Sequence, residues 1–264
     1  MVLTRSRKLL VVLITLVAFS AALALLFSYD NNSAPEASGI VLVPAYFYPA
    51  SMHFQRLISV KPEKTIIVVL NVFNGPSSEF NDDYRRAVEE LLSRGMIPVG
   101  YVYTKYTRRS ISEVEGDIDK WFEFYSGIKG VFIDEVSGDT GYYAELYNYV
   151  KSKYDGIVVL NPGTNFPPEL AQYCDYIVLF EGRPQELRGF QVDSSLQPYL
   201  GKTILLVYGV STEEFCMVYS AITRLGVRSL YVTHDNLPNP WDTLSNYFKA
   251  LAEDAVECRP TVSR

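Results

Sequence analysis

Short apolar runs alternate with amphipathic stretches along the chain after residue 38, and this alternation restricts the fold more than any other feature. Each run is nearly continuous and rich in Val, Ile and Leu, as expected for a strand that is buried on both faces of a parallel sheet. We predict strands at residues 40–46, 65–71, 97–103, 130–135, 157–161, 176–181, 203–208 and 229–233.

The stretches between these runs have the periodicity of amphipathic helices. Within residues 80–95, Tyr84 and Leu91 fall on one helical face, and Gly95 supplies a C-terminal stop. The stretch at residues 182–200 contains two prolines and two glycines and has only a weak helical pattern. We predict helices at residues 80–95, 112–126, 140–153, 211–226 and 241–254.

Eight such units predict an α/β fold, a closed (β/α)8 TIM barrel. An open doubly wound sheet is the main rival, but it usually has fewer strands and often opens with a glycine-rich phosphate turn. The first predicted strand is followed by Tyr-Phe-Tyr-Pro, with neither G-x-G-x-x-G nor G-x-x-x-x-G-K. The sequence therefore favours the barrel and predicts no nucleotide binding.

The N-terminus has the pattern of a membrane-spanning or signal helix. Three basic residues precede an uncharged run at residues 9–27, which is just long enough to cross a bilayer. The basic flank places the N-terminus inside and the rest of the chain outside. We favour an uncleaved anchor at the cell surface, and Ala22 and Ala24 leave cleavage and secretion open. The predicted division is a signal anchor or signal peptide at 1–28, a polar linker at 29–38, a barrel at 39–258 and a C-terminal tail at 259–264.

Composition excludes several classes of site. The net charge of −6, with no basic stripe, argues against a nucleic-acid partner. With two histidines, no C-x-x-C and no calcium-loop signature, we predict no metal and no cofactor. An exported protein could pair two of its three cysteines, Cys174, Cys216 and Cys258, and the sequence does not say which.

Two predicted strands end in carboxylates, Phe132-Ile133-Asp134-Glu135 and Leu179-Phe180-Glu181. An unpaired charge in an apolar interior is very costly, so these acids should lie at strand ends and face a cleft. In a barrel the active site lies at the carboxyl ends of the strands. Asp134, Glu135 and Glu181 are therefore the catalytic candidates, although strand alternation would point Asp134 and Glu135 to opposite sides unless the strand has ended.

The same strand ends carry aromatic and amide side chains. Tyrosine faces stack on sugar C–H surfaces and amides bind hydroxyl groups, so a polar polymer fits this rim better than a phosphate does. A loop His-Asp pair can relay protons but is more often part of a turn. The substrate-binding candidates are Tyr46, Tyr48, Asn71, Tyr101, Tyr103, Tyr106, Asn161, Tyr208, His234 and Asp235.

The order and spacing of six motifs resemble the spherulin-4 family (spherulation-specific family 4), which is related to glycoside hydrolase families 135 and 114. The motifs are Pro-Ala-Tyr-Phe-Tyr-Pro at 44–49, Asn-Val-Phe-Asn-Gly-Pro at 71–76, Gly-Tyr-Val-Tyr-Thr at 100–104 with Tyr106 and Arg109, Gly-Val-Phe-Ile-Asp-Glu at 130–135, Asn-Pro-Gly-Thr at 161–164 and Phe-Glu at 180–181. The resemblance covers roughly residues 40–250. The second motif departs from the family at Val72 and Ser77, which bears on substrate choice.

The resemblance implies a (β/α)8 barrel related to hydrolases that cut α-1,4-linked galactosamine-containing polysaccharides. It implies a site built from Asp134, Glu135 and Glu181, with tyrosines and Asn161 along the groove. We therefore expect an extracytoplasmic, endo-acting glycoside hydrolase that uses carboxylate acid/base chemistry. Retaining, inverting and N-acetyl-assisted routes are all open. The alternatives are a non-catalytic, membrane-tethered carbohydrate-binding barrel and a structural domain of the cell envelope.

Overall fold

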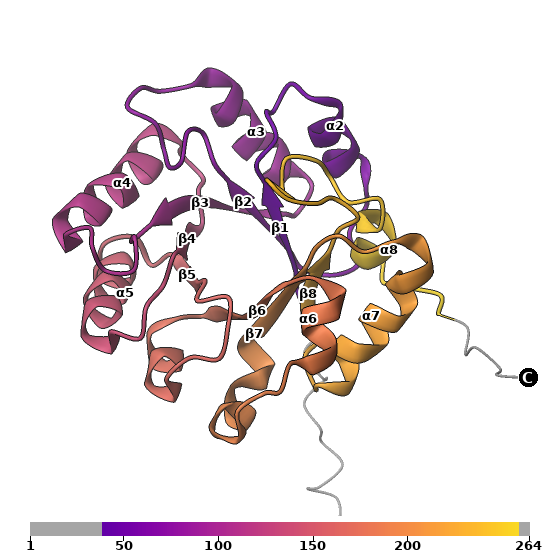
Figure 1. Cartoon of the computed structure of the whole chain (residues 1–264). Helices are drawn as coiled ribbons and strands as arrows, with labels where there is room; N and C mark the ends of the chain where they lie inside the picture. Colours follow the sequence, from indigo (N-terminus) through magenta and orange to yellow (C-terminus); the bar gives the residue numbers. More distant parts are fainter. Residues whose placement is uncertain (1–38, 259–264) are drawn as a thin grey trace, which may run out of the picture. The chain divides into compact units, whose positions relative to one another are not determined.

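The computed structural model describes residues 39–258, which form a closed barrel of parallel strands in sequential order (Figure 1). All eight predicted strands are confirmed, with ends within one residue of the prediction. The strands are β1 (Val41–Ala45), β2 (Ile66–Leu70), β3 (Ile97–Tyr103), β4 (Gly130–Asp134), β5 (Ile157–Leu160), β6 (Tyr176–Gly182), β7 (Thr203–Val207) and β8 (Ser229–Val232).

Helices cover the outside of the barrel (Figure 1). The predictions at 80–95, 112–126, 140–153 and 211–226 are confirmed as α3, α4, α5 and α7, whereas α2 was not predicted. The helical elements are α2 (Met52–Ser59), α3 (Asp82–Ser93), α4 (Ile111–Phe124), α5 (Thr140–Tyr154), α6 (Pro184–Gly189), α7 (Thr212–Arg224) and α8 (Phe248–Ala252), with 3-10 helices η1 (Pro168–Tyr173) and η2 (Ser194–Lys202).

The predicted helix at 241–254 is wrong over its first half, because α8 begins only at Phe248. Several backbone N–H groups before that point bond to side chains instead of to carbonyls one helical turn earlier. The N–H of Leu244 donates to Nδ1 of His53, and the N–H of Ser245 donates to the Tyr231 hydroxyl. The segment after β8 is consequently an irregular loop at the carboxyl end of the barrel.

Close packing between α4 and β3 depends on one glycine. A Cβ atom on Gly100 would lie 2.3 Å from the Trp121 ring, so only glycine leaves room for the indole. The Trp121 Nε1–H donates to the Tyr101 carbonyl at 2.8 Å. This contact fixes the outer side of β3, whose carboxyl end contributes to the site described below.

The predicted signal or anchor helix at 1–28, the linker at 29–38 and the tail at 259–264 lie outside the described residues. Within residues 39–258, no helix is both long enough and apolar enough to cross a membrane.

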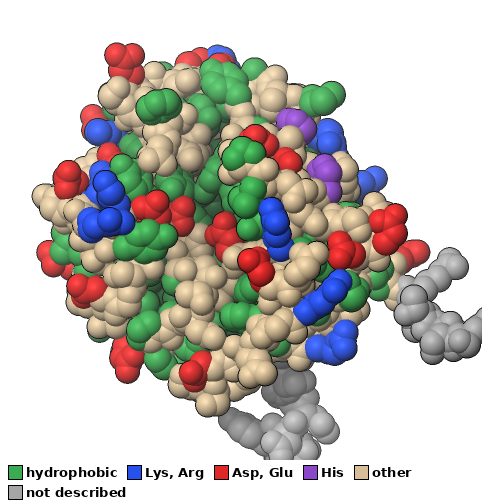
Figure 2. All heavy atoms as spheres, viewed as in Figure 1, with side chains coloured by type: hydrophobic (Ala, Val, Ile, Leu, Met, Phe, Trp, Pro, Cys, Tyr) green, Lys and Arg blue, Asp and Glu red, His purple; other side chains and the backbone are tan. Residues whose placement is uncertain are grey.

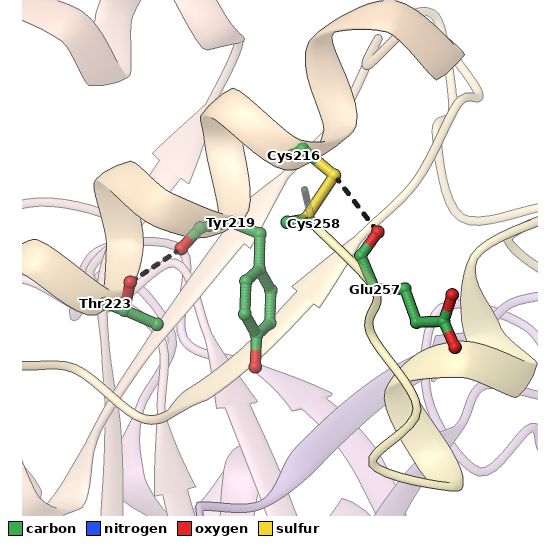
Figure 3. The surroundings of a disulfide bond; sticks show 5 residues. All are labelled: Cys216, Tyr219, Thr223, Glu257 and Cys258. Atoms are coloured by element: carbon green, nitrogen blue, oxygen red, sulfur yellow. Dashed lines mark hydrogen bonds between the residues drawn. A yellow bond between two sulfur atoms is a disulfide. The ribbon is translucent and has the colours of Figure 1, made fainter. Parts of the chain in front are cut away.

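A disulfide joins Cys216 of α7 to Cys258 (Figure 3). It connects the last described residue to the outer helical layer, across 42 positions of sequence. Cys174 is a buried free thiol that packs beside η1. Two of the three cysteines therefore pair, as expected, although the sequence did not indicate which two.

Replacing both Cys216 and Cys258 by Ser should lower the free energy of unfolding by about 2–4 kcal/mol, because the cross-link restricts the unfolded chain. Denaturant titration measures the change. Dithiothreitol should lower the midpoint of the wild type and leave the double variant unaffected. Equal midpoints for the two proteins without reductant would contradict a stabilising role.

Candidate active site

An open cleft of about 470 Å³ lies at the carboxyl ends of the strands. Acidic and hydrophobic side chains surround the hollow at the centre of this face (Figure 2). The loops after β3, β4, β5, β7 and β8 contribute to it, together with Glu181 from β6 itself. Its lining residues are Tyr106, Asp134, Glu135, Asn161, Pro162, Gly163, Glu181, Tyr208, Leu237, Pro238, Asn239, Pro240 and Trp241.

Asn161 bridges two of the predicted catalytic acids. Its Nδ2 donates to Oδ1 of Asp134 at 2.9 Å and to Oε2 of Glu181 at 2.8 Å. These two distances add to 5.7 Å, so the two carboxylate oxygens are at most 5.7 Å apart. The other amide atom, Oδ1, is buried and has no hydrogen-bond partner among the residues that the structure describes. The amide therefore holds the two acids together at the base of the cleft.

Asp134 is the last residue of β4 and accepts three hydrogen bonds. Besides the Asn161 amide, the Tyr101 hydroxyl donates to Oδ2 at 2.9 Å and the backbone N–H of Glu135 donates to Oδ1 at 2.8 Å. Burial raises the pKa of Asp134, and the charge of Glu135 adds to the rise. The three donors act against this rise because they favour the ionised form.

Glu181, near the end of β6, has fewer partners. Burial raises its pKa, and the neighbouring charge of Asp134 raises it further. Hydrogen bonds from Asn161 and Trp241 act in the opposite direction. Two carboxyl groups that share one desolvated cleft cannot both ionise easily, so this arrangement favours one proton on the pair.

Glu135 follows the end of β4 and adopts a left-handed backbone with φ of 55°. Strict strand alternation would have sent the side chains of Asp134 and Glu135 to opposite sides. Since the strand ends at Asp134 and the chain turns at Glu135, both residues line the cleft. The structure thus brings all three predicted catalytic candidates together.

Five of the ten predicted substrate-binding residues lie at or beside the acids. Tyr106, Asn161 and Tyr208 line the cleft. Tyr46 and Tyr101 meet edge to face, with ring centroids 5.5 Å apart, beside the acids. Burial, and then the charge of Asp134, raises the pKa of each of these two tyrosines, so both hydroxyls stay protonated and able to donate.

Three others are engaged elsewhere. The Tyr48 hydroxyl donates to Asp83 of α3, and Oδ1 of Asn71 accepts from the N–H of Gly75. The Tyr103 ring lies under the Arg109 guanidinium, 4.5 Å from its centroid. None of the three lines the cleft, and their role in binding substrate stays a prediction.

His234 and Asp235 also lie outside the cleft lining, in the loop after β8. Nδ1 of His234 accepts from the N–H of Asn246, and Oδ2 of Asp235 accepts from the Thr243 hydroxyl at 2.5 Å. These contacts hold together the long loop after β8, and a role in binding or proton relay stays a prediction. Across residues 39–258, no cluster of three or more His, Cys, Asp and Glu side chains is arranged to hold a metal ion.

Trp241 is the main cleft residue that sequence reasoning missed. It is largely buried, lies edge to face with Tyr208 at 6.1 Å and hydrogen-bonds to Glu181. The prediction had placed it at the start of a helix. The usable signal was Pro238 and Pro240 just before a tryptophan, a pattern typical of a loop.

Comparisons with known proteins agree with this architecture. The model of the spherulation-specific family 4 matches residues 40–255. Spherulin-4 of Physarum polycephalum is 36% identical over 168 residues, which make up 61% of this chain and 50% of that protein. The chain therefore spans about half the length of this relative.

Two solved structures share the barrel. Sph3 of Aspergillus clavatus, crystallised in complex with GalNAc, superposes with a TM-score of 0.71 at 24% identity, covering 82% of this chain and 96% of that one. The chitinase RmChi1 of Rhizomucor miehei gives a TM-score of 0.50 at 12% identity, covering 82% and 99%. At these identities the likeness shows the fold alone. The family model, which spans nearly the whole described barrel, identifies this chain as a member of the spherulation-specific family 4.

Proposed function

We propose that this protein is a glycoside hydrolase that cleaves an amino-sugar polysaccharide of the galactosamine type by carboxylate acid/base chemistry. The observation that carries the proposal is the pair of Asp134 and Glu181, held by one Asn161 amide in an open cleft. Glycoside hydrolysis needs one protonated and one ionised carboxyl group on either side of the scissile bond.

The unequal surroundings of the two acids support different roles. Asp134 accepts three hydrogen bonds, which favour its ionised form, so it is the nucleophile or electrostatic partner of the developing oxocarbenium ion. Glu181 accepts from Asn161 and Trp241 and lies next to a negative charge, so it keeps the proton. It then donates this proton to the leaving glycosidic oxygen.

The spacing of the two acids supports a retaining reaction. Carboxyl groups about 5–5.5 Å apart are typical of retaining enzymes, whereas inverting enzymes need about 6.5–9.5 Å to admit a water. The upper limit of 5.7 Å between the bridged oxygens falls on the retaining side. An N-acetyl-assisted route does not fit an α-linked substrate, because the 2-acetamido group of an α-linked unit lies cis to the leaving oxygen and cannot attack C1 from the opposite side.

Cleft shape and chemistry support a polysaccharide substrate. Tyr106, Tyr208 and Trp241 provide aromatic surface around the acids, and aromatic faces suit sugar C–H groups. The carboxylates attract an amino sugar with a free, cationic amine. The relative Sph3 was crystallised with GalNAc, which is consistent with an N-acetylgalactosamine-type unit in this site.

We further propose that the barrel works outside the membrane, anchored through residues 9–27 or secreted after cleavage. The Cys216–Cys258 disulfide supports this location, because disulfides persist mainly in oxidising compartments.

Glu181→Gln and Asp134→Asn should each lower the release of reducing ends by about 10²–10⁴-fold, since each removes a proton-transfer or charged group and keeps the shape. The substrate is partially deacetylated α-1,4-galactosamine polymer. The matched control is Glu90→Gln on the exposed side of α3, which should keep wild-type turnover. Full activity in either cleft variant would refute the assignment.

The same assay separates the remaining alternatives. NMR of the first product should show retained anomeric configuration. Comparing cleavage at N-acetylated and deacetylated units would show which amino-sugar unit the cleft accepts. Polymer binding without any release by the wild type would instead indicate a non-catalytic carbohydrate-binding barrel.

Glu181→Gln should also make the protein more stable at pH 7. Folding raises the pKa of Glu181. Above the ordinary carboxyl pKa, the native state therefore binds more protons than the unfolded state. The free energy of unfolding then falls as the pH rises. The amide removes this cost. The advantage over the wild type should shrink towards about pH 4, where the unfolded carboxyl is also protonated. Urea titrations from pH 4 to 8 measure it, and a variant less stable than the wild type at pH 7 would contradict the raised pKa.

The location is tested by labelling intact cells that produce the full chain with a membrane-impermeant amine reagent. Exposed lysines such as Lys61 and Lys105 should react without lysis. Labelling that appears only after lysis would place the barrel inside the cell.

A further inference from the structure

Thr104 is a buried polar residue directly behind the acids, and the proposed hydrolysis assigns it no role. It follows β3, is fully buried and does not line the cleft. A buried hydroxyl is costly unless it is hydrogen-bonded, and this one has several partners. Its Oγ1 donates to the Glu135 carbonyl at 2.7 Å and lies 3.0 Å from the Tyr143 hydroxyl.

The direction of these hydrogen bonds is fixed by the available hydrogens. The single hydroxyl hydrogen of Thr104 serves the Glu135 carbonyl, so the Tyr143 hydroxyl must donate to Thr104. Tyr143 in turn accepts from the backbone N–H of Ser137 at 2.8 Å. A one-way chain therefore runs from Ser137 through Tyr143 of α5 and Thr104 to Glu135.

Both backbone segments that this chain joins have left-handed conformations. Glu135 has φ of 55°, and Lys105, Tyr106 and Thr107 have φ of 52°, 56° and 66°. Such conformations are disfavoured for residues with a Cβ and persist only where the surroundings over-determine them. The Glu135 carbonyl is the meeting point, because it accepts from Thr104 Oγ1 and from the N–H of Tyr106 at 2.9 Å.

We propose that Thr104 is a positioning residue: its hydroxyl, oriented by Tyr143, holds the Glu135 carbonyl and so keeps the backbone turn that directs both Asp134 and Glu135 into the cleft. Its catalytic consequence rests on the proposed glycosidase function. Thr104 touches no substrate and acts only through the two acids. Without the hydroxyl, the Glu135 carbonyl loses a donor and the left-handed turn loses one of its restraints.

The test compares Thr104→Val, which is nearly isosteric and lacks the hydroxyl, with Thr104→Ser, which keeps it. Thr104→Val should lower kcat by about 10²-fold with KM little changed, because displacing catalytic groups slightly is enough for such a loss. Thr104→Ser should restore most of kcat. Equal losses in both variants, or wild-type kcat in Thr104→Val, would overturn the proposal.

Thr203→Val is the matched control. Thr203 is also fully buried and donates to a backbone carbonyl, that of Leu200, at 3.0 Å, but it lies at the amino end of β7 and thus at the opposite end of the barrel. The Thr203→Val variant should lose about as much thermal stability as Thr104→Val does, and it should keep the kcat of the wild type. An equal fall of kcat in this control would reduce the Thr104 effect to general destabilisation and refute a positioning role.

A crystal structure of Thr104→Val gives a readout that does not depend on activity. Glu135 should leave the left-handed region and its carboxylate should move out of the cleft; an unchanged Glu135 would refute the proposal even if turnover falls.

If the wild type releases no reducing ends, the proposed function fails while this structure still decides the role of Thr104. If Thr104→Val does not fold, Tyr143→Phe replaces it, because this change removes the hydroxyl that donates to Thr104. Its kcat and its Glu135 conformation are then measured, and they are judged by the outcomes given for Thr104→Val.

Discussion

The site depends on one shared hydrogen-bond donor, the amide of Asn161, between two partly desolvated carboxyl groups. At such close range two carboxylates repel each other, and burial strengthens the repulsion. The barrel provides the geometry, since Leu160 pairs with Ile133 across β4 and β5 and so brings Asn161 level with Asp134. The amide then satisfies one oxygen of each acid.

The backbone near the acids stores strain that the rest of the fold supports. Four non-glycine residues, Lys105, Tyr106, Thr107 and Glu135, have left-handed conformations that cost about 1–2 kcal/mol each. Hydrogen bonds tie two of them together and to their surroundings, because the Glu135 carbonyl accepts from the N–H of Tyr106 at 2.9 Å and from the Thr104 hydroxyl at 2.7 Å. Strain of this kind concentrates at functional sites, where a particular side-chain direction matters more than local stability. The strained segments here carry Glu135 and Tyr106, both of which line the cleft.

The strands were predictable because a parallel strand buried on both faces leaves an unambiguous local pattern. The acids were predictable for a related reason, since a carboxylate that ends an apolar run must find an open strand end. The loop after β8 was not predictable, because its backbone bonds to His53 and Tyr231, which are distant in sequence. The helical spacing of its apolar residues was given more weight than Pro238 and Pro240, so the loop was interpreted as a helix and Trp241 was overlooked.

The direction of Glu181 shows the same limit. The pairing of β6 with β7 shifts by one residue between Val178 and Phe180. An extra residue in a strand exchanges the faces to which later side chains point, so the bulge decides where Glu181 is directed. Nothing in the run Tyr-Ile-Val-Leu-Phe-Glu reveals it, because all its apolar residues suit either face.

The number of donors around each acid, rather than its identity as Asp or Glu, separates the two proposed roles. Tyr101 stays neutral because burial and the charge of Asp134 raise its pKa, so it remains a donor to Asp134 across the working pH range. Glu181 has no such tyrosine, and besides Asn161 its donor is Trp241. The same desolvation that disfavours the charge on Glu181 keeps it an acid, so the cost to stability and the proposed chemistry have one physical origin.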